Sequence, residues 1–247
     1  MSARNSIRIA TYNIHKCRGM DRRVSMERVA EVIRETEVDV VALQEVVRAD
    51  EQDQLTELAQ LAGYPHTAFG ENRKHRGGGY GNGLLSVFPI EHTRNYDVTM
   101  PKREPRGLLR ADIRLPSGRL LHILDVHLGT GLMERRGQAS LLLHEEVLLS
   151  KDFSAPRILL GDFNEWTRGK ATKLLSEHFQ SAEAKPVRPV VGRAKKMRSY
   201  PGFMPVLHLD HIYYDEALKL KTFRLHRSRK ALVASDHLPL VACFELA

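Results

Sequence analysis

The sequence has few of the features that point directly to a class of protein. Cys17 and Cys243 are its only cysteines, too few for a disulfide framework or a thiolate metal site. No apolar run approaches the length of a membrane-spanning helix, and the N-terminal residues contain no h-region or small-residue cleavage site. These absences predict a cytoplasmic protein without a signal peptide.

Two widespread active-site motifs are missing as well. The chain contains neither the Gly-Lys-Ser/Thr loop of nucleotide-binding proteins nor the GxSxG elbow of serine hydrolases. Its composition is 42% hydrophobic and 28% charged, which is enough to bury a substantial core. There are no internal repeats and no linker-like boundaries, so we expect a single domain over residues 1–247.

The charge balance is basic. Lys and Arg outnumber Asp and Glu by 38 to 30, a formal net charge of +8. Basic residues crowd into 185–198 and 225–230, while acidic residues cluster in 27–57. A basic surface attracts polyanions such as nucleic acids or anionic lipid head groups, but the same excess also serves solubility. The charge alone leaves both interpretations open.

Strand-like and helical patterns alternate along the chain. Ser25 is placed to cap the first helix, and Gly63 and Pro65 would stop the second. The expected strands are 7–13, 39–45, 84–88, 90–98, 108–115, 120–128, 156–160, 209–214, 218–225 and 239–244, and the expected helices are 25–35, 52–62, 134–149 and 170–179. This order predicts a layered α/β sandwich with mixed or largely antiparallel sheets.

Nearly every apolar strand ends in, or is followed by, acid, amide or imidazole groups. Residues two apart in a strand share a face, so two such groups can point at one place. Each site alone has a structural explanation as a turn, a cap, an ion pair or a hydrogen-bonded core histidine. Six of them at strand ends favour a functional site. They are Asn13, Glu45, Asp125 with His127, Asp162 with Asn164, Asp210 with His211, and Asp236 with His237.

These residue types suit one kind of chemistry. Carboxylates and amide oxygens are hard ligands that favour Mg²⁺ or Mn²⁺ over Zn²⁺. Histidines supply general acid or base catalysis near neutral pH. Arg103, Arg106 and Arg110 offer fork-shaped donors for phosphate oxygens. Together they predict metal-assisted hydrolysis of a phosphoester.

Seven short motifs connect these residues to a known family. "TYNIH", "VVALQEV", "YGNGLLS", "VHLG", "GDFN", "LDHIYY" and "SDHLPL" occur in order between Ile9 and Leu240. In this order and spacing the chain resembles the endonuclease/exonuclease/phosphatase superfamily of DNase I-like enzymes. The resemblance implies a four-layered α/β sandwich, with two mixed, mostly antiparallel sheets flanked by helices and a site at one edge.

The resemblance also implies roles for individual residues. Glu45 would be the principal ligand of a divalent metal, Mg²⁺ or Mn²⁺, with Asn13 beside it and Asp236 completing the shell. Asp162 would orient or deprotonate the attacking water, and Asn164 would hold a phosphate oxygen.

The remaining roles concern the imidazoles and the substrate. His237 would contact the phosphate or act as base, oriented by Asp210, and His127 would assist the leaving oxygen. Asn82, Arg103 and Arg106 resemble positions that reach the substrate.

Two features bear on the choice of substrate. His15 stands where abasic-site nucleases often carry Asp, and only Trp166 and a few Tyr and Phe are available to intercalate into DNA. The basic stretch 185–203 is a candidate substrate loop, although a solvated loop would have the same composition.

We therefore expect a metal-dependent hydrolase whose partner is an anionic phosphoester in a nucleic acid or a phospholipid-type molecule, with a diester favoured over a monoester. The alternatives are a phosphomonoesterase, or a catalytically inactive module that binds polyanions on the same scaffold.

Overall fold

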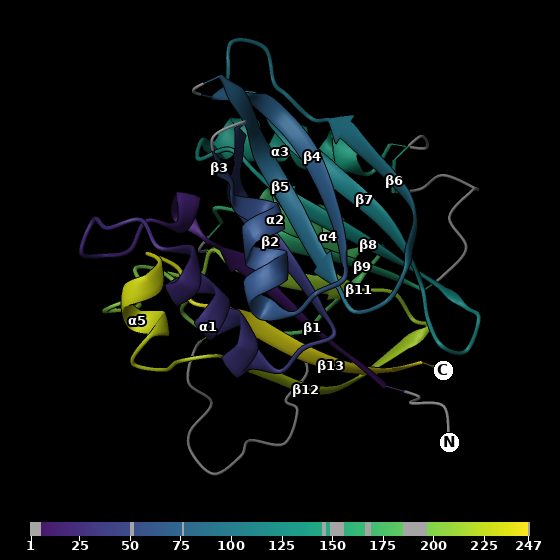
Figure 1. Ribbon diagram of the computed structural model, residues 1–247. Helices are drawn as coiled ribbons and strands as arrows, with labels where there is room; N and C mark the ends of the chain where they lie inside the picture. Colours follow the sequence, from purple (N-terminus) through teal and green to yellow (C-terminus); the bar gives the residue numbers. More distant parts are fainter. Residues whose placement is uncertain are drawn as a thin grey trace.

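Two β-sheets face each other, and helices cover the outer face of each (Figure 1). The computed structural model describes residues 6–49, 52–75, 77–144, 147–148, 156–165, 169–184 and 197–246. Within these residues the fold is the expected α/β sandwich of four layers, with mixed and mostly antiparallel sheets.

The first sheet has seven strands in the order β12-β13-β1-β2-β5-β4, with β3 paired to β2. Its central pair, β1 and β2, is parallel, and the other pairings are antiparallel. The strands are β1 (Ser6–Asn13), β2 (Val40–Ala49), β3 (Gln52–Asp53), β4 (His66–His75), β5 (Gly78–Ser86), β12 (Leu218–Leu225) and β13 (Leu240–Leu246).

The second sheet has six strands in the order β10-β11-β9-β8-β7-β6. Here β8 and β9 form the parallel pair at the centre, and the other neighbours are antiparallel. The strands are β6 (Ile90–Asp97), β7 (Gly107–Arg114), β8 (Leu120–His127), β9 (Arg157–Asp162), β10 (Gln180–Ser181) and β11 (Asp210–Tyr214).

The longer helices begin and end where local chemistry allows. Ser25 accepts a hydrogen bond from the Arg28 N–H and caps α1, and Asp53 caps α2 in the same way through the Thr56 N–H. Gly63 ends α2 at φ 81°, a left-handed conformation that glycine adopts without strain. The helices are α1 (Met26–Thr36), α2 (Gln54–Ala62), α3 (Leu132–Leu142), α4 (Lys170–Ser176) and α5 (Ala231–Ala234), and a 3₁₀ turn covers His15–Cys17.

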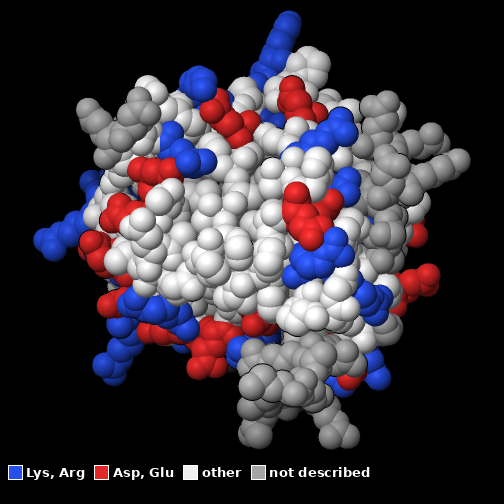
Figure 2. Space-filling model, turned by 45° about the vertical axis from the view of Figure 1, so that its right-hand side comes forward, with Lys and Arg blue, Asp and Glu red and all other residues white. Residues whose placement is uncertain are grey.

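Charged side chains of both signs share the surface. On the face drawn in Figure 2, Lys and Arg stand among Asp and Glu around a largely uncharged centre. The excess of basic residues is therefore not segregated on this face, and an anionic partner has to be argued from the candidate site. No helix among the described residues is long and apolar enough to cross a membrane.

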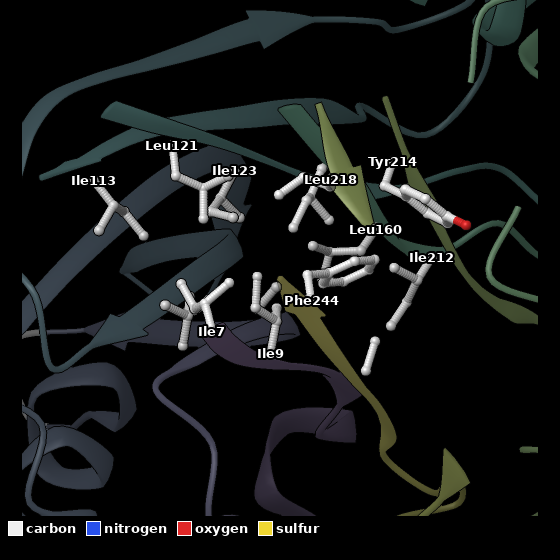
Figure 3. Packing of buried hydrophobic residues seen from close by; sticks show 14 of the residues in the cluster. Ile7, Ile9, Ile113, Leu121, Ile123, Leu160, Ile212, Tyr214, Leu218 and Phe244 are labelled. Carbon is white, nitrogen blue, oxygen red and sulfur yellow. The ribbon is translucent and has the colours of Figure 1, made fainter. Parts of the chain in front are cut away.

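Three hydrophobic clusters separate the four layers. The largest lies between the sheets, where Figure 3 shows Ile9 and Phe244 of the first sheet against Ile123 and Leu160 of the second. A second cluster packs α1, α2 and α5 onto the first sheet, and a third packs α3 and α4 onto the other. Burial of these apolar faces is the main force that holds the layers together.

The structure differs from the expected elements in a few places. Strand β4 was not predicted, because its sequence HTAFGENRKH is polar and lacks the alternation of a half-buried strand. Such charged residues are typical of an edge strand, which β4 is. The helix expected over 134–149 begins earlier, at Leu132, and ends at Leu142, whose carbonyl accepts the Leu148 N–H at 3.0 Å. Leu148 then packs into the third cluster without helical structure.

Candidate active site

Strand register gathers polar residues at one edge of the sandwich. In the second sheet, Asp162 pairs with His127 on the parallel neighbour β8 and with Asp210 on the antiparallel neighbour β11. In the first sheet, Asn13 ends β1 opposite Gln44, and Glu45 follows on β2. The carboxyl ends of β1, β8 and β9 and the amino end of β11 therefore meet at this edge, as the strand-end pattern predicted. Glu45 is the exception, because β2 continues past it to Ala49.

The loop after β9 shows why the sequence GDFN is needed there. A side chain on Gly161, at φ 141°, would collide with the Val126 carbonyl oxygen, so only glycine fits. Asp162 Oδ1 accepts the backbone N–H of Asn164 at 2.9 Å. Asn164 adopts φ 51°, which asparagine tolerates, and its side-chain amide donates to the Leu128 carbonyl at 2.9 Å. This turn leaves Asp162 Oδ2 facing the site.

Three donors surround that second oxygen of Asp162. Asn13 Nδ2 donates to Oδ2 at 3.0 Å, and the Nε2 atoms of His127 and His237 each lie 3.6 Å from it. Asp162 is only 1% exposed, so these groups replace water around its charge. The structure thus brings together residues from β1, β8, β9 and the segment before β13.

His237 lies between two carboxylates. Its Nδ1 contacts Asp210 Oδ2 at 2.9 Å, and its Nε2 faces Asp162. Burial by itself would lower the pKa of His237, but Asp210 and then Asp162 outweigh it and raise the pKa to about 10. The imidazole of His237 is therefore positively charged at neutral pH.

His127 has the opposite electrostatic setting. Burial, with the nearby Arg106 guanidinium, lowers the pKa of His127 more than Asp162 and Glu45 raise it. Arg106 Nη1 lies 3.5 Å from His127 Nδ1, and since arginine only donates, Nδ1 is the acceptor and Nε2 carries the proton. His127 is therefore a neutral imidazole that presents an N–H toward Asp162.

Glu45 projects from an irregular part of β2. Two residues of β2, Gln44 and Glu45, oppose the single residue Asn82 of β5, which makes a β-bulge. Glu45 has φ 61°, a strained conformation for glutamate that is common at functional sites. Its carboxylate accepts from Asn13 Nδ2 at 3.3 Å and contacts Lys16 Nζ at 2.5 Å. Burial opposes its ionisation, but His127 and Lys16 bring the pKa of Glu45 to about 2.

Asp236 lies beside a left-handed turn that follows β1. His15, Lys16 and Cys17 have φ values of 48°, 59° and 56°. This turn places His15 Nδ1 3.6 Å from Asp236 Oδ1, and the His15 N–H donates to Asn13 Oδ1 at 3.0 Å. Ser235 donates from Oγ to the Asn13 carbonyl at 2.7 Å, which ties the segment before β13 to the end of β1.

The expected substrate residues divide into two groups. Asn82 is fully buried and donates to the carbonyls of Gly107 and Asp125, while its Oδ1 has no hydrogen-bond partner among the described residues. Arg103 is exposed and Arg106 is buried, and both line a small hollow of about 250 Å³ next to His127. Arg110 instead forms a bidentate pair with Asp112 at 2.7 Å. The other residues lining the hollow are Lys102, Glu104, Gly129, Thr130 and Glu134.

Sequence reasoning missed two contacts of the site. Lys16 is the cation on Glu45, and no motif position pointed to it. Tyr200 places its ring 5.0 Å from that of His237, and Gly202 donates its N–H to the Asp236 carbonyl at 2.6 Å. Tyr200 and Gly202 belong to the basic stretch 185–203, of which residues 185–196 lie outside the described residues. Trp166 lies outside them as well. Its long and irregular character was the only signal.

The donor set fits a hard divalent cation. Glu45 is held ionised and already contacts a cationic group. Asn13 turns its amide nitrogen to Glu45 while its Oδ1 accepts the His15 N–H, so this side chain would have to rotate to offer an oxygen ligand. Asp236 Oδ1 lies 3.6 Å from His15 Nδ1. Asp162, Asp210 and His237 also lie within 4.8 Å of one another, but the charged imidazole of His237 has no lone pair to offer a metal. Carboxylate and amide oxygens in this arrangement suit Mg²⁺ or Mn²⁺.

The chain is similar to proteins of one known family. The model of the Endonuclease/Exonuclease/phosphatase family matches residues 10–237. The chain is 32% identical to the uncharacterized protein YbhP of Escherichia coli (strain K12) over 265 residues, covering 96% of this chain and 95% of the relative.

Solved structures show the same fold. An endonuclease/exonuclease/phosphatase from Beutenbergia cavernae DSM 12333 is 25% identical, with a TM-score of 0.77 over 99% of this chain and 72% of that one. The human Nocturnin catalytic domain with a bound sulfate anion is 22% identical, with a TM-score of 0.74 over 98% of this chain and 94% of that one. Since the family model covers nearly all of the sequence, the chain belongs to the endonuclease/exonuclease/phosphatase family.

Proposed function

We propose that this protein hydrolyses a phosphoester, preferentially a phosphodiester, with Mg²⁺ or Mn²⁺ as cofactor. The observation that carries the proposal is the environment of Asp162 Oδ2. One buried carboxylate oxygen is approached by the amide of Asn13 and by two imidazoles, His127 and His237, at 3.0 to 3.6 Å. This arrangement resembles an acid–base centre more than a turn, since a turn needs only the contact between Asp162 and the Asn164 N–H.

The two imidazoles suit different tasks because their environments differ. His237, charged and held by Asp210, would donate from Nε2 to a phosphate oxygen and stabilise the negative charge that develops on it. His127, neutral with its proton on Nε2, would donate that proton toward the leaving oxygen. Asp162 lies between them as the acceptor for a proton of the attacking water.

The remaining residues would hold the cofactor and the phosphate. Glu45, Asn13 and Asp236 are the proposed metal ligands, and a bound divalent cation would supply charge to polarise a phosphoryl oxygen. Asn164 would bind a phosphate oxygen through its amide once substrate replaces its contact with the Leu128 carbonyl. Polar residues from both sheets would therefore act together in one site.

An anionic substrate is supported by the hollow beside His127. Three cationic side chains, Lys102, Arg103 and Arg106, line it with two acidic ones, Glu104 and Glu134, so the lining carries a net charge of +1. Arg106 Nη2 is paired with Glu104 Oε2 at 2.9 Å, which leaves Lys102 and Arg103 to meet an anion first. Arginine forks bind phosphate oxygens well. The similar fold of the human Nocturnin catalytic domain binds a sulfate anion, which has the tetrahedral shape of phosphate. Asn82 Oδ1, which has no hydrogen-bond partner among the described residues, would accept a hydrogen bond there and help to position the substrate.

Hydrolysis of bis-p-nitrophenyl phosphate with and without EDTA tests the proposal. We expect turnover that Mg²⁺ or Mn²⁺ restores after chelation. A panel of DNA, RNA, phospholipids, inositol phosphates and nucleotides then separates diesters from monoesters. Binding to any of these without EDTA-sensitive turnover would instead identify a catalytically inactive module that binds polyanions.

A further inference from the structure

A second group of possible metal ligands lies on the other face of β11. Glu183, His208 and His211 each offer a ligand atom within 4.8 Å of the others. His208 Nε2 lies 2.8 Å and His211 Nδ1 lies 2.7 Å from the same oxygen, Glu183 Oε1. Because neighbouring residues of a strand point to opposite faces, His211 faces away from the site that Asp210 enters.

The ring of His211 is oriented as metal-bound histidines usually are. Its Nε2 lies 2.9 Å from the Glu165 carbonyl oxygen, which can only accept, so Nε2 carries a proton. Nδ1 donates to Glu183 Oε1 at 2.7 Å, and a bound metal would replace that proton. Metal-ligating histidines commonly donate their other N–H to a backbone carbonyl in this way. Phe163 packs edge-on against the ring at 5.4 Å, and His211 is 7% exposed. The ligand geometry is therefore already fixed on one side.

We propose that Glu183, His208 and His211 bind a Zn²⁺ ion, separate from the cation at the catalytic edge. Two imidazole nitrogens and one carboxylate oxygen are a familiar zinc donor set, distinct from the hard oxygen set around Glu45. Zinc ligands at tetrahedral positions lie about 3.3 Å apart, given bond lengths of about 2.0 to 2.1 Å. Glu183 would need to move back by only about half an ångström, since its present contacts are 2.7 and 2.8 Å.

The space for that movement and for a fourth ligand is available. The Glu183 side chain is 28% exposed and follows the short strand β10, whereas His211 is held in place by the sheet. A water molecule can complete the tetrahedron from the solvent side. His211 is the fixed ligand of the site, and Glu183 moves to complete it.

A metal here would support the loop that carries Asp162. The backbone carbonyl of Glu165 holds His211, and the carboxylate of Glu165 accepts the N–H of Thr172 at 2.9 Å at the start of α4. Zinc would therefore connect the turn at Glu183, strand β11 and the GDFNE loop on the outer side of the sheet. The inference does not depend on the proposed hydrolysis.

Zinc content measured in excess Mg²⁺ tests the assignment. The purified full-length chain is equilibrated with Zn²⁺ and Mg²⁺, freed of unbound metal, and analysed for bound zinc. We expect His208→Ala and Glu183→Gln to contain one equivalent of zinc less than the wild type. We also expect Zn²⁺ to raise the Tm of the wild type but not of His208→Ala, since an ion that binds only the folded state stabilises it.

His226→Ala is the matched control. His226 Nε2 also contacts one glutamate, Glu35, at 3.1 Å, but it belongs to no cluster of three ligands among the described residues. Its zinc content should equal that of the wild type. Equal zinc in the wild type and in both cluster variants, each shown by circular dichroism to be folded, would overturn the proposal, as would a wild type without zinc.

Discussion

Replacement of Asp162 by Asn separates a turn from an acid–base centre. The new amide would keep its oxygen as acceptor for the Asn164 N–H, so the turn after β9 survives. On the other side, however, its NH₂ group would face the amide of Asn13 and the Nε2–H groups of His127 and His237. The Asp162→Asn variant therefore loses the charge and the proton acceptor but keeps the shape.

The structure sets the scale of both effects. Loss of a general base lowers kcat by about a hundredfold or more. Loss of buried hydrogen bonds to a charged group costs about 1 to 3 kcal/mol in the free energy of unfolding. In a domain of this size, each kcal/mol lowers the Tm by about 2 to 4 °C. We expect a folded protein with a modestly lower Tm and almost no activity.

Asp215→Asn provides the matched control. Asp215 is also buried and follows β11 at the opposite end of the sheet, where it accepts from the Arg157 backbone N–H at 2.8 Å and from Arg157 Nε at 3.1 Å. Its replacement should lower the Tm on a similar scale while kcat for bis-p-nitrophenyl phosphate stays at the wild-type value. An Asp162→Asn protein with wild-type kcat would refute the catalytic assignment and leave only the turn.

Four further outcomes follow from the same contacts. Glu45→Gln should lose most Mg²⁺-dependent activity, measured across a metal titration, because a neutral ligand weakens the site; full activity at ordinary metal concentration would exclude Glu45 as principal ligand. Asp210→Asn should lower kcat and lower the pKa of His237, followed by NMR of the imidazole; an unshifted titration would mean that the pair does not form. Because the folded pKa of His237 is raised to about 10, from an ordinary 6.5, its stabilising contribution is complete below pH 6.5 and disappears as the pH rises through 10. Denaturant unfolding in EDTA should show this loss, and His237→Ala should lack it. Asp125→Asn should keep kcat near the wild-type value, because burial raises the pKa of Asp125 well above its ordinary range and its Oδ1 contacts Gln44 rather than the candidate site; a dead enzyme would place Asp125 in the chemistry.

The position of the site could be predicted from the sequence because strand ends are visible in it. Apolar runs that stop at Asn13, His127 and Asp162 mark the carboxyl ends of three strands, and parallel pairing brings such ends to one edge. Glu45 reaches the same edge from a bulge within β2, which continues to Ala49. Strand β4 could not be predicted in this way, since an edge strand needs little apolar sequence and its pairing with β5 is non-local. The pattern of apolar residues therefore predicts buried strands better than exposed ones.

The electrostatic difference between the two histidines was not predictable. His127 and His237 both follow or precede a strand beside an acidic residue, so their sequence settings are alike. The family resemblance already implied Asp210 beside His237, but only the fold places Arg106 next to His127. Since pKa values depend on burial and on charges within a few ångströms, acid and base roles become distinct only in three dimensions.

Contact between the sheets is what completes the site. Asn13 and Glu45 come from one sheet, and His127 and Asp162 come from the other, so neither sheet alone contains the acid–base centre. Asp125 shares the face of His127 but lies deeper, where Gln44 Nε2 donates to its Oδ1 at 2.6 Å across the gap between the sheets. Asp125 is fully buried, and burial raises its pKa well above the ordinary range, which favours the uncharged form at this contact. Asp125 and His127 are two residues apart on β8. The deeper residue, Asp125, therefore connects the two sheets, and His127 at the edge is free to act on a substrate.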